Sequence, residues 1–246
     1  MKISIITVCF NSQQTIKATI KSVINQSYKQ VEYIIIDGAS TDNTIKIIKE
    51  FSNSIDVFVS ESDAGIYDAI NKGISKSSGD VVGILHADDV FDNNSVIDNV
   101  MHLFDENVDM IYGDINYVDR KDINRVIRRW KSDSYTKGKF KWGWMPPHTG
   151  FFIKKSCYLK YGLYNLSLGS SADYELMLRM FEVYNLKSKY IPLNITKMRV
   201  GGISNSSFKN RWEANRNDKK SWKINGLKPF WFTFLIKPII KIKQFF

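Results

Sequence analysis

The chain has 246 residues, of which 43% are hydrophobic and 24% are charged, a composition typical of a soluble globular protein. Two cysteines, Cys9 and Cys157, exclude a disulfide framework and lack the spacing of metal ligands, so we expect a reducing compartment. The net charge is +10, and the whole excess lies in residues 197–246, where twelve lysines and arginines accompany two acidic residues.

Strands and helices alternate in the first hundred residues. The apolar run at the start is short and ends at Asn11-Ser12 without a cleavage site, so we interpret it as a strand and not as a secretory signal. Apolar, β-branched runs predict strands over 3–8, 31–38, 55–61 and 81–85, and helical periodicity predicts helices over 16–24, 44–51 and roughly 66–77. This alternation predicts an α/β fold with a mostly parallel sheet and helices on both faces.

The pattern changes after residue 95. It predicts a helix over 95–104, a short strand over 109–114, a hairpin over 114–131, an aromatic loop leading to a strand at 150–154, and a helix over roughly 172–184. No repeat or low-complexity linker interrupts the chain. We therefore expect one domain over 1–205, with a nucleotide-binding half (1–112) and an acceptor-side half (113–205), followed by a basic segment over 206–246.

Polar side chains follow the predicted parallel strands where each strand ends, which is the edge at which such sheets bind ligands. Asp88 and Asp89 come directly after a buried strand, and Mg²⁺ and Mn²⁺ bind through one or two carboxylates together with substrate phosphates. A solvated turn or a helix cap is the alternative for this pair. Asp37 can accept hydrogen bonds from a ribose or a base, or it can serve the turn that follows it.

Four stretches occur in order along the chain: "SIITVCFNSQQTIKATIKSVINQSY", "EYIIIDGASTDNT", "SESDAGIYDAINKGISKSSGD" and "LHADD". Together they resemble the family 2 glycosyltransferases of the GT-A fold, in particular the bacterial polysaccharide-assembly branch. "PPHTGFF" and "SSADYELMLR" extend the similarity, which covers roughly residues 1–205.

The resemblance implies a role for each matched position. It implies nucleotide-sugar binding by Thr7, Asn11, Asp37, Asp63, Gly65, Lys72, Asp88 and His148. Asp88 and Asp89 match the family's DXD-type metal motif, with Asp89 the direct ligand of Mn²⁺ or Mg²⁺ and Asp88 nearer the ribose. The family often has Asn-Ser before these two acids, whereas this chain has His86-Ala87, a difference that leaves the donor open.

An inverting transfer also needs a carboxylate that accepts the proton of the attacking hydroxyl. Motif position favours Asp173 over Glu175, and because residues two apart on a helix do not share a face, only one of them should reach the cleft. A helix N-cap is the alternative for Asp173. His148 is expected to contact the diphosphate, the metal or the acceptor, or else to be a structural loop residue.

Three further features remain. Trp142 and Trp144 either stack on sugar rings or are simply exposed or packed in the core, and Gly201 to Ser204 resembles a loop that closes over the donor. The segment 227–246 mixes aromatic residues with four lysines, and its longest apolar stretch is far short of the roughly 20 residues of a membrane span. It suits an anionic membrane surface, with a packing or dimerisation helix as the alternative.

The expected protein is thus a cytoplasmic enzyme at the inner face of the cell membrane. It would move a sugar from a nucleotide-sugar donor to a saccharide acceptor, lipid-linked, with inversion and with Mn²⁺ or Mg²⁺. A catalytically silent member that binds nucleotide-sugar within an assembly complex is the alternative. No nucleic-acid partner is expected, and the motifs of dehydrogenases and P-loop enzymes are absent from the sequence.

Overall fold

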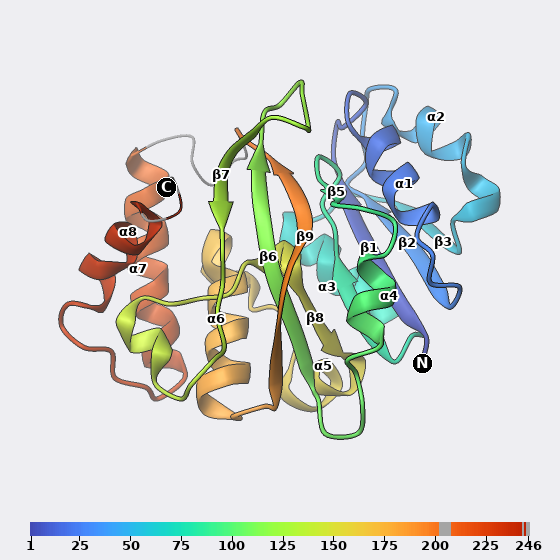
Figure 1. Ribbon diagram of the computed structural model, residues 1–246. Helices are drawn as coiled ribbons and strands as arrows, with labels where there is room; N and C mark the ends of the chain where they lie inside the picture. The colour runs from blue at the N-terminus through green and yellow to red at the C-terminus, as the bar shows by residue number, and fades with distance from the viewer. Residues whose placement is uncertain (202–207, 243, 245–246) are drawn as a thin grey trace.

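The computed structural model describes residues 1–201, 208–242 and 244. Its first half is a parallel sheet in the order β3-β2-β1-β4 (Figure 1). Its strands and helices are β1 (Ile3–Cys9), α1 (Ile16–Ile24), β2 (Val31–Asp37), α2 (Thr44–Lys49), β3 (Val57–Ser60), α3 (Ile66–Lys76) and β4 (Val81–Ile84). The alternation expected from the sequence is confirmed. The side chains of β1, β2 and β4 are buried almost throughout, and those of the edge strand β3 are half-buried or exposed.

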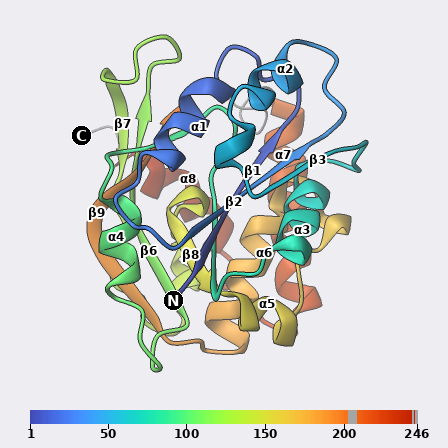
Figure 2. The same cartoon turned by 90° about the vertical axis from the view of Figure 1, so that its right-hand side faces the viewer.

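Helices cover both faces of this sheet (Figure 2). Ile3 and Ile5 of β1 pack in the hydrophobic cluster that includes α1, whereas Ile6 packs in the cluster that includes α3. The alternation follows from the two-residue period of a strand. Gly73 lets α3 approach closely, because a Cβ atom at this position would lie 2.5 Å from Cγ2 of Ile6.

The sheet continues through β4-β8-β6-β9-β5, with β7 paired to β6, giving nine strands in the described part of the chain. The added elements are β5 (Val90–Phe91), α4 (Val96–Met101), β6 (Met110–Val118), β7 (Val126–Trp130), β8 (Phe151–Lys154), α5 (Lys155–Tyr161), α6 (Ala172–Leu178) and β9 (Ser188–Arg199). β8 is antiparallel to β4, and β6 is antiparallel to β8 but parallel to β9. The result is an α/β fold around one mixed sheet of parallel and antiparallel strands.

The strands β6 and β9 differ from the prediction. The short strand at 109–114 and the first arm of the hairpin are a single strand, β6, and the hairpin is completed by β7. The long strand β9 was not predicted. Its pairing with β6 shifts register around Pro192, which has no N–H to donate, and this interruption hides the strand in the sequence.

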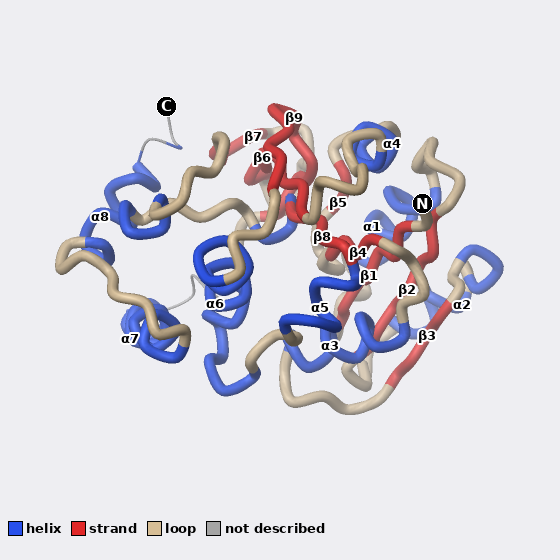
Figure 3. The backbone as a smooth tube through the Cα atoms, turned by 90° about the horizontal axis from the view of Figure 1, so that it is seen from below, coloured by secondary structure: helices blue, strands red, loops and turns tan. Residues whose placement is uncertain are grey.

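The C-terminal segment forms α7 (Phe208–Ile224) and α8 (Thr233–Ile242), which lie at the end of the molecule away from β1 to β3 (Figures 1 and 3). Trp222 is 1% exposed and donates from Nε1 to the Tyr174 hydroxyl at 2.8 Å, so α7 packs on α6. Gly202, Ile203 and Ser204 of the expected donor-closing loop lie outside the described residues. Within the described residues, no helix has both the length and the apolar character needed to cross a bilayer.

Candidate active site

The parallel strands β1, β2, β3 and β4 end at one edge of the sheet, as expected for a ligand-binding edge. The residues that follow the strands there are Phe10 and Asn11, Gly38 to Ser40, Glu61 to Asp63, and His86 to Asp89. The polar and acidic residues predicted at the four strand ends are thus brought to the same edge.

Asp89 is fully buried at this edge. Its Oδ1 accepts a hydrogen bond from the Arg199 backbone N–H at 3.2 Å, whereas Oδ2 has no hydrogen-bond partner among the described residues. Burial, and next to it the charge of Asp88, hold the pKa of Asp89 well above its usual value. A buried carboxylate oxygen without a partner is costly unless a cation or a proton compensates it.

The backbone around the two acids is fixed by its neighbours. The Thr19 hydroxyl on α1 lies 2.9 Å from the Ala87 carbonyl oxygen and 2.7 Å from that of Asp89. Arg199, at the end of β9, donates from its guanidinium to the Asp88 carbonyl. The acids therefore occupy a rigid loop, and Arg199, which the sequence did not indicate, supports it from the last strand.

Asp88 and Asp89 fit a divalent cation that completes its coordination with substrate oxygens. Carboxylate oxygens are the ligands that Mg²⁺ and Mn²⁺ prefer, and the unpartnered Oδ2 of Asp89 supplies one. In the described part of the chain, no cluster of three or more His, Cys, Asp or Glu side chains forms a cage for a metal. The donor set therefore suits a metal shared with phosphate oxygens.

Thr7 and Asp37 lie inside the sheet and not on its surface. Both side chains are fully buried. Asp37 accepts hydrogen bonds from the Ser40 N–H at 2.9 Å and from the Ser60 hydroxyl at 2.7 Å, and Thr7 accepts one from Tyr33 at 3.2 Å. These contacts hold the ends of β1, β2 and β3 together, and a direct contact of either side chain with a nucleotide stays a prediction.

Asn11 and Asp63 both lie beside residues that follow β2. Asn11 has a left-handed backbone (φ 47°), and its Oδ1 accepts the Thr41 N–H at 2.9 Å. At Gly38, a Cβ atom would lie 2.6 Å from Oδ2 of Asp63, so only glycine lets that carboxylate lie against the strand end. The exposed ring of Phe10 borders the same position, and the edge here combines a carboxylate, an amide and an aromatic face.

Gly65 directly precedes α3, and Lys72 lies in the second half of this helix. Gly65 precedes the helix with a φ of 115°. Lys72 lies 3.0 Å from Oε1 of Glu61 and donates to the Ser62 carbonyl at 2.9 Å. Through these contacts Lys72 connects α3 to the loop after β3. A contact of Lys72 with a donor stays a prediction.

A cluster of histidines and tyrosines borders the metal motif. His148 hydrogen-bonds through Nε2 to the Tyr164 hydroxyl at 2.8 Å, and its ring centroid lies 5.7 Å from that of His86. Tyr67 of α3 stacks on Tyr164 at 5.4 Å. Burial lowers the pKa of each histidine to about 4, so both are neutral at neutral pH. Tyr67 and Tyr164 were missed because a tyrosine in a helix or a loop usually indicates packing.

Asp173 lies in the first turn of α6 beside Tyr67. Burial is the largest cause that raises its pKa, to about 6, and Asp218 of α7 adds to it. The hydrogen bond from the Tyr174 N–H, at 2.7 Å, opposes the increase, as do Lys237 and Tyr67.

Glu175, two residues after Asp173, is 2% exposed and pairs with Arg179 at 2.8 Å. The two acids of this motif therefore have separate environments, and Glu175 is committed to a structural ion pair.

Tyr117 of β6 also faces this region and was not predicted. Burial is the largest cause that raises the pKa of Tyr117, and the charges of Asp89 and Asp173 add to the increase. The Arg128 guanidinium, which lies 3.7 Å from the centroid of the Tyr117 ring, lowers the pKa. Trp144 packs against the core, whereas Trp142 is 56% exposed, and stacking of either ring on a sugar stays a prediction. Trp142 contacts Phe230 and Phe232 of the C-terminal segment, and Trp144 packs on Phe140.

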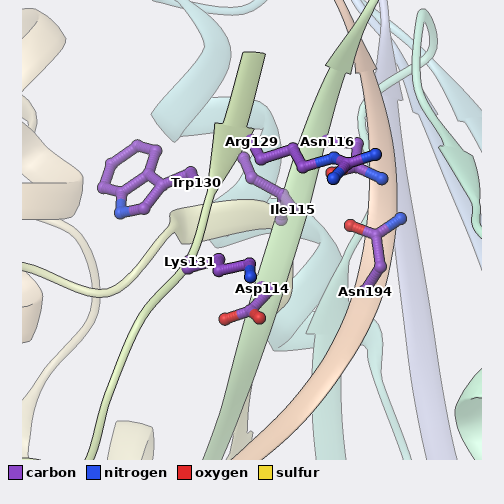
Figure 4. A pocket seen from close by; sticks show the side chains of 7 residues that line it. All are labelled: Asp114, Ile115, Asn116, Arg129, Trp130, Lys131 and Asn194. Carbon is purple, nitrogen blue, oxygen red and sulfur yellow. The ribbon is translucent and has the colours of Figure 1, made fainter. Parts of the chain in front are cut away.

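A cavity of about 240 Å³ lies on β6, β7 and β9 (Figure 4). It is lined by Asp114, Ile115, Asn116, Arg129, Trp130, Lys131 and Asn194. Asp114 is held there by the Ser132 N–H at 2.7 Å and the Tyr190 hydroxyl at 2.9 Å. None of the predicted catalytic, metal-binding or nucleotide-binding residues lines it.

Comparison with known structures confirms the fold. Staphylococcus aureus TarS in complex with UDP-GlcNAc superimposes with a TM-score of 0.69 at 15% identity, over 90% of this chain and 66% of that one. The mannosyltransferase PcManGT of Pyrobaculum calidifontis, in complex with GDP-Man and Mn²⁺, gives a TM-score of 0.65 at 17% identity, over 99% and 69%. The chain thus spans somewhat under two thirds of the TarS chain.

Curated relatives and a family profile agree with each other. A glycosyltransferase of Mycobacterium tuberculosis described as uncharacterized is 31% identical over 182 residues, covering 72% of this chain and 68% of that protein. A PGL/p-HBAD biosynthesis glycosyltransferase of Mycobacterium bovis is 26% identical over 210 residues, covering 82% and 79%. The profile of glycosyl transferase family 2 matches residues 4–164, and the chain therefore belongs to this family of glycosyltransferases.

Proposed function

We propose that this glycosyltransferase moves a hexosyl group, with inversion, from a nucleotide-diphosphate sugar to a saccharide acceptor. The observation that carries the proposal is the buried, unpartnered Oδ2 of Asp89 beside Asp88 at the carboxyl end of β4. TarS binds UDP and UDP-GlcNAc, and PcManGT binds GDP-Man and Mn²⁺, in folds similar to this one, which supports a nucleotide-sugar donor here.

Asp89 and Asp88 would hold Mn²⁺ or Mg²⁺. When bound, the cation neutralises the negative charge that develops on the departing diphosphate. Arg199 and Thr19 keep the two acids in place before the donor arrives. The rigid loop means that no reorganisation of the carboxylates is needed at the moment of reaction.

Asp173 acts as the general base in this proposal. The acceptor hydroxyl forms a bond to the anomeric carbon while the bond from that carbon to the diphosphate oxygen breaks. The hydroxyl proton passes to the Asp173 carboxylate, and the nucleotide diphosphate leaves with the electron pair. A base is most effective when its pKa lies near the working pH, and the pKa of about 6 at Asp173 satisfies this condition.

The remaining predicted residues form the donor side of the site. Asn11, Asp63 and Gly65 would contact the nucleotide at the exposed edge, while Thr7 and Asp37 hold the strand ends behind it. Lys72 would exchange its contact with the Glu61 loop for one with the donor. Neutral His148, fixed by Tyr164, would donate or accept a hydrogen bond near the diphosphate.

We further propose a lipid-linked acceptor used in bacterial surface polysaccharide assembly, at the inner face of the cell membrane. The support is the basic C-terminal segment, which contains most of the net charge of the chain and combines lysines with aromatic residues. Such segments bind anionic leaflets peripherally.

The test is a thermal-shift titration with nucleotides and nucleotide-sugars, with and without Mn²⁺, followed by transfer assays on the best donor. We expect the nucleotide to stabilise the protein only when metal is present, and EDTA to abolish transfer. Asp89→Asn should remove the metal-dependent stabilisation, whereas the control Glu50→Gln, which alters only a surface ion pair with Lys17, should retain it. Full metal-dependent turnover by Asp89→Asn would contradict the proposed site.

A further inference from the structure

An exposed group of apolar side chains joins the middle of the chain to its C-terminal segment. This aromatic patch consists of Trp142, Phe230, Trp231, Phe232 and Leu235. Trp231 is 84% exposed, Leu235 62% and Trp142 56%. Large apolar side chains gathered in this way on a soluble protein mark an interaction surface.

The patch is an ordered structure and not a loose tail. The ring of Trp142 lies 5.6 Å from that of Phe230 and 5.4 Å from that of Phe232, and Trp231 packs edge-on against Phe232 at 5.5 Å. Beneath it, Thr233 donates to the Lys141 carbonyl at 2.6 Å and Phe234 is buried. The start of α8 therefore has one face against the protein and one, with Leu235, towards solvent.

Positive charge surrounds the patch. The ammonium group of Lys141 lies 5.4 Å from the Phe230 ring. Lys228, two residues before Phe230 in the chain, is exposed. Exposed Lys219 of α7 lies 5.5 Å from the ring of Phe234. The acid Asp218 on the same helix is already neutralised by Lys237, at 2.5 Å.

We propose that the aromatic patch inserts into the headgroup region of an anionic lipid surface, with the surrounding lysines contacting the lipid phosphates. Tryptophan and phenylalanine favour that region, and lysines beside them are attracted to anionic leaflets. A second copy of the chain fits less well, because a two-fold contact through this patch would bring the same lysines of both copies together. The proposal deepens the membrane contact proposed above by assigning it to residues, and it makes Trp142, from the middle of the chain, part of the contact.

The test is a sedimentation assay of the full chain with phosphatidylglycerol–phosphatidylcholine vesicles and with pure phosphatidylcholine vesicles. We expect binding to the anionic vesicles that weakens with salt. The double variant Trp231→Ser/Leu235→Ser should lower the partition coefficient by about tenfold or more. The matched control is Leu159→Ser on α5, since Leu159 is a 75% exposed leucine at a position away from the patch.

A second measurement separates this proposal from the proposed transfer reaction. The double variant and Leu159→Ser should both retain the Mn²⁺-dependent stabilisation by nucleotide, which reports a folded protein with an intact donor site. Equal vesicle binding by the two variants would overturn the proposal. It would also be overturned if Trp231→Ser/Leu235→Ser left vesicle binding unchanged but converted a dimer to a monomer in analytical ultracentrifugation, because a second copy would then cover the patch.

Discussion

Asp173 combines the proposed role of base with a cost to the fold. Its carboxyl has a folded-state pKa of about 6, against a value of 3.8 for an unperturbed aspartate, chiefly because it is buried. The folded state therefore binds the proton more tightly than the unfolded state. Its contribution to stability is complete below about pH 4 and is lost as the pH rises through 6.

Asp173→Asn should lower the transfer rate by about 10²–10⁴-fold, because the acceptor hydroxyl loses its base. It should also raise the free energy of unfolding by on the order of 1–2 kcal/mol above pH 6, since no charge is then buried. Initial rates, with urea unfolding at about pH 5 and about pH 8, measure both effects. Asp98→Asn, an exposed acid on α4, is the control; an active Asp173→Asn would exclude the role of base.

The acids at strand ends could be placed from the sequence, whereas their partners could not. A strand that ends at Ile84 puts Asp88 and Asp89 at the ligand-binding edge wherever the remaining chain lies. Arg199 reaches the same place only because β9 pairs with β6 far along the chain. Tyr117 and Tyr164 are likewise brought in by tertiary packing, which local periodicity does not encode.

Some secondary-structure elements could likewise be predicted from the sequence, and others could not. Strands of the first half were predicted because each is a short apolar run between turns, and three of the four, β1, β2 and β4, are buried on both faces. β9 was not predicted because its burial is irregular and because Pro192 interrupts its pairing with β6. The packing of α7 was not predicted either. A helix with many lysines gives little sign that one of its faces carries a fully buried tryptophan, Trp222.

α7 and α8 place an ion pair behind the proposed base. Lys237 of α8 lies 2.5 Å from Asp218 of α7 and 3.8 Å from the centroid of the Tyr174 ring, next to Asp173 in the chain. Asp218 raises the pKa of Asp173, and Lys237 lowers it. The two terminal helices thereby influence the electrostatics of the proposed base.

Asp218→Asn should shift the acidic limb of the activity profile to lower pH. Removing this carboxylate removes a charge that raises the pKa of Asp173 and leaves the charge of Lys237 without its counterion, and both changes favour the ionised base. The measurement is kcat/KM against pH. Glu213→Gln, an exposed acid on the same helix, should leave the profile unchanged. A shift to higher pH would contradict the proposed electrostatic coupling.

The whole molecule is arranged around one mixed sheet with helices on both faces and a helical pair at one end (Figures 1 and 3). The charge of the chain is distributed in the same way, since residues 1–196 balance and the excess lies in the C-terminal helices and the segment before them. An asymmetric charge of this kind orients a protein at an anionic surface. The end with the aromatic patch would then face the lipid.

The packing of α7 makes a strong prediction about truncated chains. A chain of residues 1–205, the domain drawn from the sequence, would lose Trp222 and leave the Tyr174 hydroxyl and Glu175 without their partners Trp222 and Asn225. Because burial of one large aromatic side chain contributes about 3–5 kcal/mol, we expect this chain to unfold at much lower denaturant concentration than the full chain. A chain of residues 1–227 keeps these contacts and loses α8 with Lys237 and most of the aromatic patch. Because this chain also loses the buried Phe234 and leaves the buried Asp218 without Lys237, it should unfold between the 1–205 chain and the full chain, and it should bind anionic vesicles poorly. Equal stability of the 1–205 and full chains would instead show that the C-terminal segment is an independent body.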